Sequence, residues 1–309
     1  MIYNRGIINT GSGSVSADRA IIGSDYVVAR DEALHQPSAA TKRRTDVGVI
    51  TILPVEMRAV LTMLSRNTAV TEHIDERGAW FYEAAIEAGD GVNVVATRAL
   101  DRGQRSALIA FDRLVHAYAP GVVVLVGIAG GMSSAVKLND VVVATQAIYY
   151  EARKETPSQV RRRTQTYEVP ARIRHAINSF FNVHGEPCTL ILKGQDGKER
   201  ACSIQTGPIG SGEAVVAYKG SDIRRHLENF NDKTLALETE VGGIAHAFYE
   251  EVHSQQDTFG WFTIRGISDY ADEDKNDGYH ESSAWHAALV LERLLPYLKL
   301  ATPRKREDR

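Results

Sequence analysis

The feature that most limits how this chain can fold is the apolar run at residues 122–126, which contains no polar residue. A strand with one face in water alternates apolar and polar side chains, whereas a strand covered by helices on both faces is continuously apolar. The run is too short to span a bilayer, and Gly127, Gly130 and Gly131 follow it closely. It therefore predicts a buried central strand in a soluble α/β domain.

The same order of strand, turn and helix repeats from Asp46 onward, which is typical of an α/β layered domain. The first helix is predicted to begin at Pro54, because proline suits a first helical turn. Strands are predicted at 47–52, 80–86, 92–99, 121–126, 139–144, 234–237 and 259–265, helices at 54–64, 104–118, 171–181, 241–248 and 280–298, and a hairpin at 189–193 and 201–205.

The two ends of the chain differ from its middle. Residues 1–44 contain many glycines and serines without sustained periodicity, so they are predicted to be a flexible or partner-binding leader. Residues 45–300 would form one domain, and 301–309 a charged tail.

Charge and cysteine content narrow the class of protein. Lysine and arginine total 36 against 39 aspartates and glutamates, and the resulting net charge of −3 disfavours a general nucleic-acid-binding protein. No secretory signal or membrane span is visible. The two cysteines, Cys188 and Cys202, are predicted to be packing residues rather than a disulfide, so the expected location is the cytoplasm.

Polar residues or glycines follow four of the predicted strands, at the positions where ligands bind in α/β sheets. Glu56 follows the first strand, the glycines at 127–131 the central one, Glu238 and Glu240 the next, and Asp269 the last. Each also has a purely structural explanation: a tight turn for the glycines, a favourable helix dipole for the two glutamates, and a cap for the aspartate. No single one of these signals decides a function.

Two other chemistries are disfavoured. His280 and Glu281 begin like a zinc-binding helix, but the second histidine is missing at the required spacing and His286 lies on a different face. Ser211 lacks the spacing of a nucleophile elbow. The sequence therefore predicts neither a metal site nor a serine hydrolase.

Taken in order, four segments resemble the nucleoside phosphorylase and nucleosidase superfamily, especially its methylthioadenosine/S-adenosylhomocysteine nucleosidase branch. The resemblance covers about residues 46–298 and implies a three-layer αβα sandwich with a central mixed, mostly parallel sheet. It also implies a homodimer or higher homo-oligomer. The segments are VGVITILPVEMRAVLTML at 47–64, VLVGIAGGMSSAVKLNDVVV at 124–143, LETEVGGIAH at 237–246 and IRGISDYAD at 264–272.

The resemblance also implies a division of labour. Glu56 would activate the attacking water, Asp269 would protonate N7 of the departing purine, and Glu240 would hold the ribose hydroxyls, with no metal or organic cofactor. An acid and a base on opposite sides of the bond suit this cleavage, as in glycoside hydrolysis. The other residues implied to contact the substrate are Glu238, Thr239, Ile128, Ala129, Gly130, Ser268 and Val215.

Three of these positions depart from the nucleosidase branch. Ile128 replaces a serine, Thr239 replaces the methionine between the two glutamates, and Val215 stands where an aromatic residue is expected. Loss of the aromatic side chain would remove some stacking on the purine. The identity of the substrate is therefore left open.

The loop at 272–277 is more similar to nucleosidase-like domains of bacterial and fungal conflict proteins, some of which act on adenine nucleotides. This implies a phosphorylated substrate, a role in antiviral defence, and a leader that docks a sensor protein. The candidate phosphate contacts are Arg105, Lys275, Arg102 and Arg153.

The function predicted from these observations is hydrolysis of the N-glycosidic bond of a purine nucleoside or adenine nucleotide. Two alternatives remain open: a phosphorylase that uses inorganic phosphate in place of water, and a ligand-sensing or scaffold module without turnover. Retention of Glu56 favours water, because a base beside an anionic phosphate nucleophile would be less useful.

Overall fold

The computed structural model describes residues 45–66, 68–87, 91–194, 197–251 and 258–300. The predicted leader and the predicted charged tail lie outside these ranges. The chain divides after Lys42, and all the described residues belong to the second unit, Arg43–Arg309.

The second unit contains one large sheet, a small two-stranded sheet and six helices in its described part. The strands are β1 (Val47–Thr51), β2 (Thr71–Ile74), β3 (Trp80–Ile86), β4 (Val92–Arg98), β5 (Val122–Gly131), β6 (Val141–Tyr149), β7 (Arg153–Glu155), β8 (Val160–Arg162), β9 (Gln165–Glu168), β10 (Cys188–Lys193), β11 (Glu199–Ser211), β12 (Ala236–Glu238) and β13 (Trp261–Asp269). The helices are α1 (Pro54–Ser65), α2 (Gln104–Tyr118), α3 (Ala171–His184), α4 (Asp222–Phe230), α5 (Val241–Glu251) and α6 (His280–Leu298).

The large sheet is mixed and has the order β10-β11-β6-β13-β5-β1-β4-β3-β2. Strands β13, β5, β1 and β4 run parallel as successive neighbours, and β11 is parallel to β6. Antiparallel pairs lie toward the two edges and between β13 and β6. Strand β12 bridges the ends of β11 and β5, and β9 pairs with β6.

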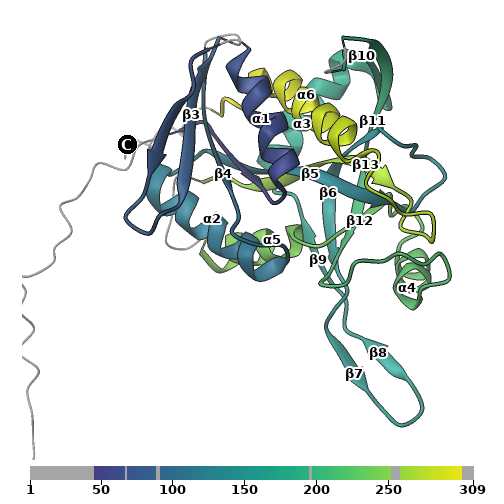
Figure 1. Cartoon of the computed structure of the whole chain (residues 1–309). Coiled ribbons are helices and arrows are strands. Elements are labelled where there is room, and N and C mark those ends of the chain that lie inside the picture. The colour runs from purple at the N-terminus through teal and green to yellow at the C-terminus, as the bar shows by residue number, and fades with distance from the viewer. Residues whose placement is uncertain (1–44, 67, 88–90, 195–196, 252–257, 301–309) are drawn as a thin grey trace, which may run out of the picture. The chain divides into compact units, whose positions relative to one another are not determined.

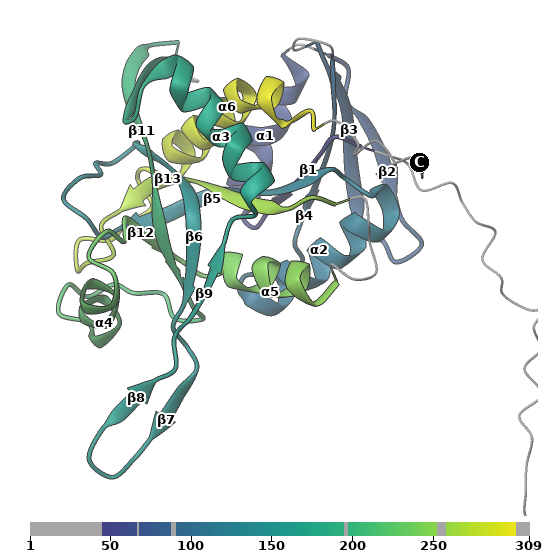
Figure 2. The same cartoon turned by 180° about the vertical axis from the view of Figure 1, so that it is seen from behind.

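Helices cover both faces of this sheet, as Figure 1 and Figure 2 show from opposite sides. Helices α1, α3 and α6 pack on one face, and α2 packs with α5 on the other. Residues 122–126 of β5 are fully or almost fully buried, as their continuous apolar character predicted. The three-layer αβα arrangement is therefore confirmed.

The sequence located the strongly periodic elements well. The ranges of β3, α2 and α6 match the predicted ones, and the predicted hairpin is the antiparallel pair β10–β11. The pattern missed β2, β9, α4 and the small hairpin β7–β8. All these elements except α4 are short strands with mainly exposed residues, so burial leaves no periodic mark on their sequence.

One prediction about the central strand is wrong. The strand was predicted to end at Val126, with a turn or a ligand loop at the glycines of 127–131, but β5 continues through them to Gly131. This extension pairs with β13 on one side and β12 on the other, which keeps the backbone extended.

Cys188 and Cys202 are free and buried, as predicted. Within the described ranges, no helix has the length and apolar character needed to cross a membrane. The same ranges contain no group of three or more histidine, cysteine, aspartate or glutamate side chains placed to hold a metal ion.

Candidate active site

A pocket of about 220 Å³ opens where the carboxyl ends of β1, β5 and β13 meet β12. Parallel strands bring their carboxyl ends to one edge of the sheet, which is why segments distant in sequence meet here. Of the predicted site residues, Arg105 and Arg153 lie outside the pocket lining. Those inside it are Glu56, Arg102, Ile128, Ala129, Gly130, Val215, Glu238, Thr239, Glu240, Ser268, Asp269 and Lys275.

Glu56 lies in the first turn of α1 and is almost completely buried. Its Oε2 atom accepts hydrogen bonds from the backbone amides of Ile52 and Leu53, both at 2.8 Å. Its Oε1 atom accepts a third from the amide of Ile128, at 2.9 Å. Burial raises the pKa of Glu56, and the nearby Arg265 charge opposes that rise. The result is a fixed carboxylate with enhanced basicity.

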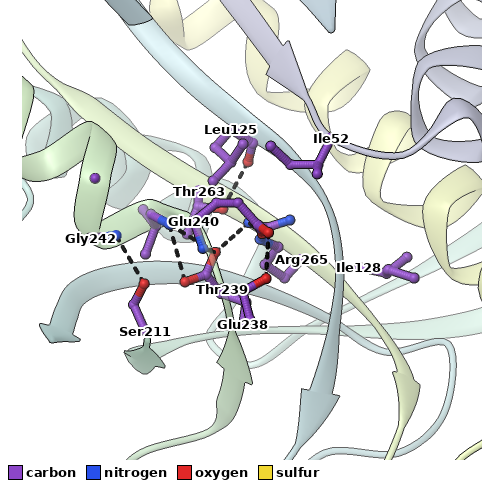
Figure 3. Close-up of polar contacts among 12 residues, drawn as sticks. Ile52, Leu125, Ile128, Ser211, Glu238, Thr239, Glu240, Gly242, Thr263 and Arg265 are labelled. Carbon is purple, nitrogen blue, oxygen red and sulfur yellow. Dashed lines mark hydrogen bonds and ion pairs between the residues drawn. The ribbon is translucent and has the colours of Figure 1, made fainter. Parts of the chain in front are cut away.

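Arg265 joins the three glutamates of the pocket, and Figure 3 shows it beside Glu238 and Glu240. Its Nη2 atom donates to Glu238 and lies 3.2 Å from Oε2 of Glu240, while Nη1 lies 3.9 Å from Oε1 of Glu56. Its side chain is only 1% exposed. One guanidinium thus balances part of the charge of three buried carboxyl groups.

Sequence reasoning assigned Arg265 no role. The residue lies within β13, whose nine residues are all buried, and it is the only cation in that strand. A charged side chain in a buried strand must find a partner, so this interruption of an apolar pattern was an available signal.

Glu238 and Glu240 have different tasks although they are two residues apart. Glu238 accepts hydrogen bonds from the amides of Glu240 and Val241 at the start of α5, so the helix-capping explanation holds for it. Burial raises its pKa, and Arg265 again opposes the rise. Glu240 instead accepts from the Gly103 amide at 3.1 Å and from the Thr239 hydroxyl, on the pocket side of the helix start.

Ser211 holds the neighbouring strand and helix together. Its Oγ atom accepts a hydrogen bond from the amide of Gly242 at 2.9 Å, as Figure 3 shows. It accepts another from Nε2 of Gln104, also at 2.9 Å. The same Gln104 amide donates to the carbonyl oxygens of Gly212 and Thr239. These contacts give Ser211 a structural role in positioning the segment that carries Glu240.

Asp269 ends β13 and is 5% exposed. Its Oδ1 atom accepts from the amide of Ala271 at 2.8 Å, and its Oδ2 atom from the hydroxyl of Ser268 at 3.0 Å. The ammonium group of Lys275 also donates to Oδ2. Lys275 therefore lies at the Asp269 end of the pocket, and its predicted contact with phosphate remains a prediction.

The glycines of β5 make room for these acidic groups. A Cβ atom on Gly127 would collide with the Glu56 carboxylate and the Arg265 guanidinium, and one on Gly130 would come within 2.9 Å of Asp269 Oδ1. None of the three glycines has a positive φ. Gly127 and Gly130 are required for close approach of side chains and not for a turn.

Glu56 and Asp269 both reach the end of β5. Glu56 bonds the amide of Ile128, while Asp269 pairs with Gly130 two residues further along. Two strand residues span about 7 Å. Two carboxyl groups whose backbone partners lie this far apart, in one pocket with Glu240, form a constellation suited to cleaving a bond between two ring systems.

The pocket rim is less specialised. Val215, which replaces the aromatic residue expected from the resemblance, is 62% exposed and lies beside Ala214 and Val216 in the lining. Ile128 contributes its backbone amide to Glu56, a contact that any non-proline residue can supply. The change from serine to isoleucine at this position is therefore compatible with the geometry around Glu56.

Known proteins resemble this chain in sequence. The ATP nucleosidase Cap17 of Escherichia coli strain KTE188 is 24% identical over 275 residues, and a second Escherichia coli protein of that name gives the same figures. These matches cover 85% of this chain and 52% of the relatives, so the chain spans about half their length.

Solved structures show the same fold. The 5′-methylthioadenosine/S-adenosylhomocysteine nucleosidase of Neisseria meningitidis aligns with a TM-score of 0.61 at 20% identity, covering 81% of this chain and 98% of that one. The futalosine hydrolase of Helicobacter pylori gives 0.61 at 18%, covering 82% and 97%. The S-adenosylhomocysteine nucleosidase of Streptococcus pyogenes gives 0.63 at 18%, also covering 82% and 97%.

The sequence model of one family agrees with these structural likenesses and with the order of the four segments around the pocket. It is described as the Phosphorylase superfamily, and it matches residues 46–299, which is nearly the whole of the described domain. This chain belongs to the Phosphorylase superfamily.

Proposed function

We propose that this protein hydrolyses the N-glycosidic bond of a purine nucleoside or adenine nucleotide and releases the free base. The observation that carries the proposal is the meeting of Glu56, Asp269 and Glu240 in one pocket at the end of β5. The Escherichia coli relatives named ATP nucleosidase support adenine nucleotides as the substrate class.

In this proposal Glu56 is the general base. Breaking the bond leaves positive charge on the sugar, which a water molecule must attack as it loses a proton. The raised pKa of Glu56 makes its carboxylate a better proton acceptor, and three backbone amides hold it in a single orientation. General base catalysis of this kind contributes about 10²–10⁴ in rate.

Asp269 is the proposed acid that delivers a proton to N7 of the leaving purine. Ser268 and Lys275 contact the same carboxyl oxygen, so a positive charge lies where negative charge develops on the base. Glu240, which the Gly103 amide holds, would accept hydrogen bonds from ribose hydroxyls. The substrate would then lie with its sugar near Glu240 and its base near Asp269.

We further propose that the enzyme acts in the cytoplasm as a homodimer or higher homo-oligomer. Its resemblance to conflict proteins supports a role in bacterial antiviral defence, with a sensor protein engaging the leader. The family relationship supports self-association but does not specify the number of subunits.

A chromatographic screen for free base tests the reaction. The full-length protein is incubated with adenosine, inosine, methylthioadenosine and ATP, with and without inorganic phosphate. Base release in the absence of phosphate is expected. Release that requires phosphate would instead establish a phosphorylase, an activity for which the family is named. Nucleotide binding without base release from any substrate would establish the non-catalytic alternative.

Two amide variants test the roles of the carboxyl groups. Glu56→Gln and Asp269→Asn should each lower kcat by about 10² or more, because each removes one proton transfer. Glu281→Gln and Asp272→Asn are matched controls, since neither residue lines the pocket. Full activity of Glu56→Gln, with a folded protein by circular dichroism, would remove Glu56 from the reaction.

A further inference from the structure

A second hollow adjoins the proposed active-site pocket and shares one lining residue with it. It has a volume of about 380 Å³ and lies between the end of β4, the loop that follows, and the exposed side of α2. Arg102 lines both cavities. The two cavities therefore adjoin at this side chain.

The hollow is strongly basic. Arg98, Arg102, Arg105 and Arg113 all line it, and Asp101 is the only acidic residue among its described lining residues. Asp101 accepts a hydrogen bond from the backbone amide of Arg102. Arginine stays protonated at all physiological pH values, so the hollow carries an excess of fixed positive charge.

These four guanidinium groups make no ion pair with any carboxylate of the described ranges. The Nε atom of Arg113 is buried and has no hydrogen-bond partner there. A buried donor without a partner costs free energy, and four unbalanced cations in one concavity repel each other. An anionic ligand would remove both costs.

The arrangement follows from the sequence of α2. Arg105, Ile109 and Arg113 are spaced four residues apart, so they share one face of the helix. No acidic residue lies in the first turn of α2, and the carboxylate that accepts from the amide of its N-cap residue, Gly103, is Glu240 of the active-site pocket. Ser106, in the same turn, also lines the hollow.

We propose that this hollow binds the 5′-polyphosphate of a nucleotide whose ribose lies at Glu240. The inference rests on the proposed function, because it takes the ribose position from it. Gly103 donates its amide to Glu240, and Arg102 is the residue immediately before it. A phosphate chain that leaves the ribose past Arg102 enters the arginine-lined hollow. Arg98, Arg105 and Arg113 are thus specificity-determining residues for nucleoside polyphosphates.

Base release from a graded series of substrates measures this specificity. The full-length protein is assayed with adenosine, AMP, ADP and ATP, and kcat/KM is expected to rise with each added phosphate. Arg98→Gln and Arg113→Gln should each lower kcat/KM for ATP about tenfold or more, as expected for loss of a charge-assisted hydrogen bond. Adenosine has no phosphate, so its kcat/KM should change less than about twofold.

Arg174→Gln is the matched control, because Arg174 is an arginine on α3 that lines neither cavity. Arg98 is exposed at the end of its strand, so its replacement tests the hollow even if the partly buried Arg113 variant fails to fold. Equal loss with adenosine and ATP, or no loss with either, would overturn the inference and leave the proposed nucleosidase intact.

A binding measurement separates this inference from the reaction itself. Inorganic tripolyphosphate, titrated into the full-length protein in a calorimeter, should bind and should compete with ATP. Arg98→Gln and Arg113→Gln should weaken this binding about tenfold. If no substrate yields free base but tripolyphosphate binding depends on these arginines, the proposed function fails while the phosphate site stands. Tripolyphosphate binding that both variants leave unchanged would refute the site.

Discussion

Arg265 is the residue on which the charge balance of the pocket depends. It contacts Glu238 and Glu240 directly and lies near Glu56, and all four side chains are buried. Removing one partner of a buried ion pair leaves an uncompensated charge, which costs about 3–5 kcal/mol. Arg265→Met should lower the free energy of unfolding in urea by this amount at neutral pH.

The loss should become smaller as the pH falls. Without the guanidinium, the pKa values of Glu56 and Glu238 rise further in the folded state, so the folded protein takes up protons that relieve the repulsion. Arg58→Met is the control, because Arg58 is exposed and pairs only with the exposed Glu281 in the described ranges. A pH-independent loss would mean that packing and not charge explains the effect.

The pH dependence of catalysis follows from the interaction of Glu56 with Arg265. Burial raises the pKa of Glu56 above its ordinary value of 4.5, and the base must be ionised to accept a proton. We therefore expect kcat/KM to fall on the acidic side at a pH above 4.5. Arg265→Lys retains a charge but not the guanidinium fork, so it should shift this limb less than Arg265→Met does. An acidic limb that neither variant moves would contradict the coupling.

Among individual residues, the sequence predicted the acidic ones and missed the cation between them. Glu56, Glu240 and Asp269 follow buried strands, which is where ligands bind in such sheets, so position alone marked them. Arg265 lies inside a strand, where its charge signals that it needs a partner but does not show which residues supply one. Its partners come from α1, β12 and the start of α5, and only the folded sheet brings these together.

At the scale of elements, β5 carries the closest packing around the site. Gly127→Ala would place a methyl group against Glu56 and Arg265, both of which are held by several hydrogen bonds and ion pairs. We expect a loss of kcat/KM of at least about 10², since a displacement of about 1 Å costs this much. Overpacking should also reduce stability by about 1–3 kcal/mol, measured by urea denaturation.

Gly131→Ala is the matched control on the same strand. Its added Cβ atom would lie 3.2 Å from methyl groups of Ile267 and Val136, which can shift by a few tenths of an ångström. We expect this variant to keep most of its activity. Equal loss in the two variants would show that the strand tolerates no side chain, whatever that side chain faces.

The elements also show why glycines mislead a sequence-based prediction. Helices α2 and α6 were predicted to the residue because their apolar spacing reflects burial. The glycines of β5 suggested a turn because most glycine clusters form one. Here their function is the absence of a side chain, and the neighbours that require it belong to distant segments, so nothing local distinguishes the two cases.

At the scale of the whole molecule, α6 is fixed to the sheet through Asn139, which has a positive φ of 71°. The side-chain oxygen of Asn139 accepts from Ser282 and Ser283, and its backbone carbonyl accepts from Nδ1 of His286 at 2.8 Å. Burial lowers the pKa of His286 and the Asn139 bond partly opposes this. The imidazole is therefore kept neutral with a proton on Nδ1.

A lowered histidine pKa predicts acid sensitivity. The unfolded chain binds a proton near pH 6.5 and the folded chain does so only at lower pH, so stability is lost as the pH falls below about 6.5. Urea unfolding between pH 7.5 and pH 5 should show this decline, and His286→Asn should reduce it. His73→Asn, at an exposed position on β2, should leave the decline unchanged.

The pocket is lined by residues in or directly after β1, β5, β12 and β13. Strands β1 and β13 are the first and the last of the large sheet along the chain. Loop closure over such sequence separations is slow, and no contiguous fragment of the domain holds the complete set of groups. During refolding, catalytic competence should return only in the final step, after helical circular dichroism has recovered. Enzymatic turnover would then show that the entire domain has folded. Proteolytic cleavage that separates the two ends of the domain would abolish turnover.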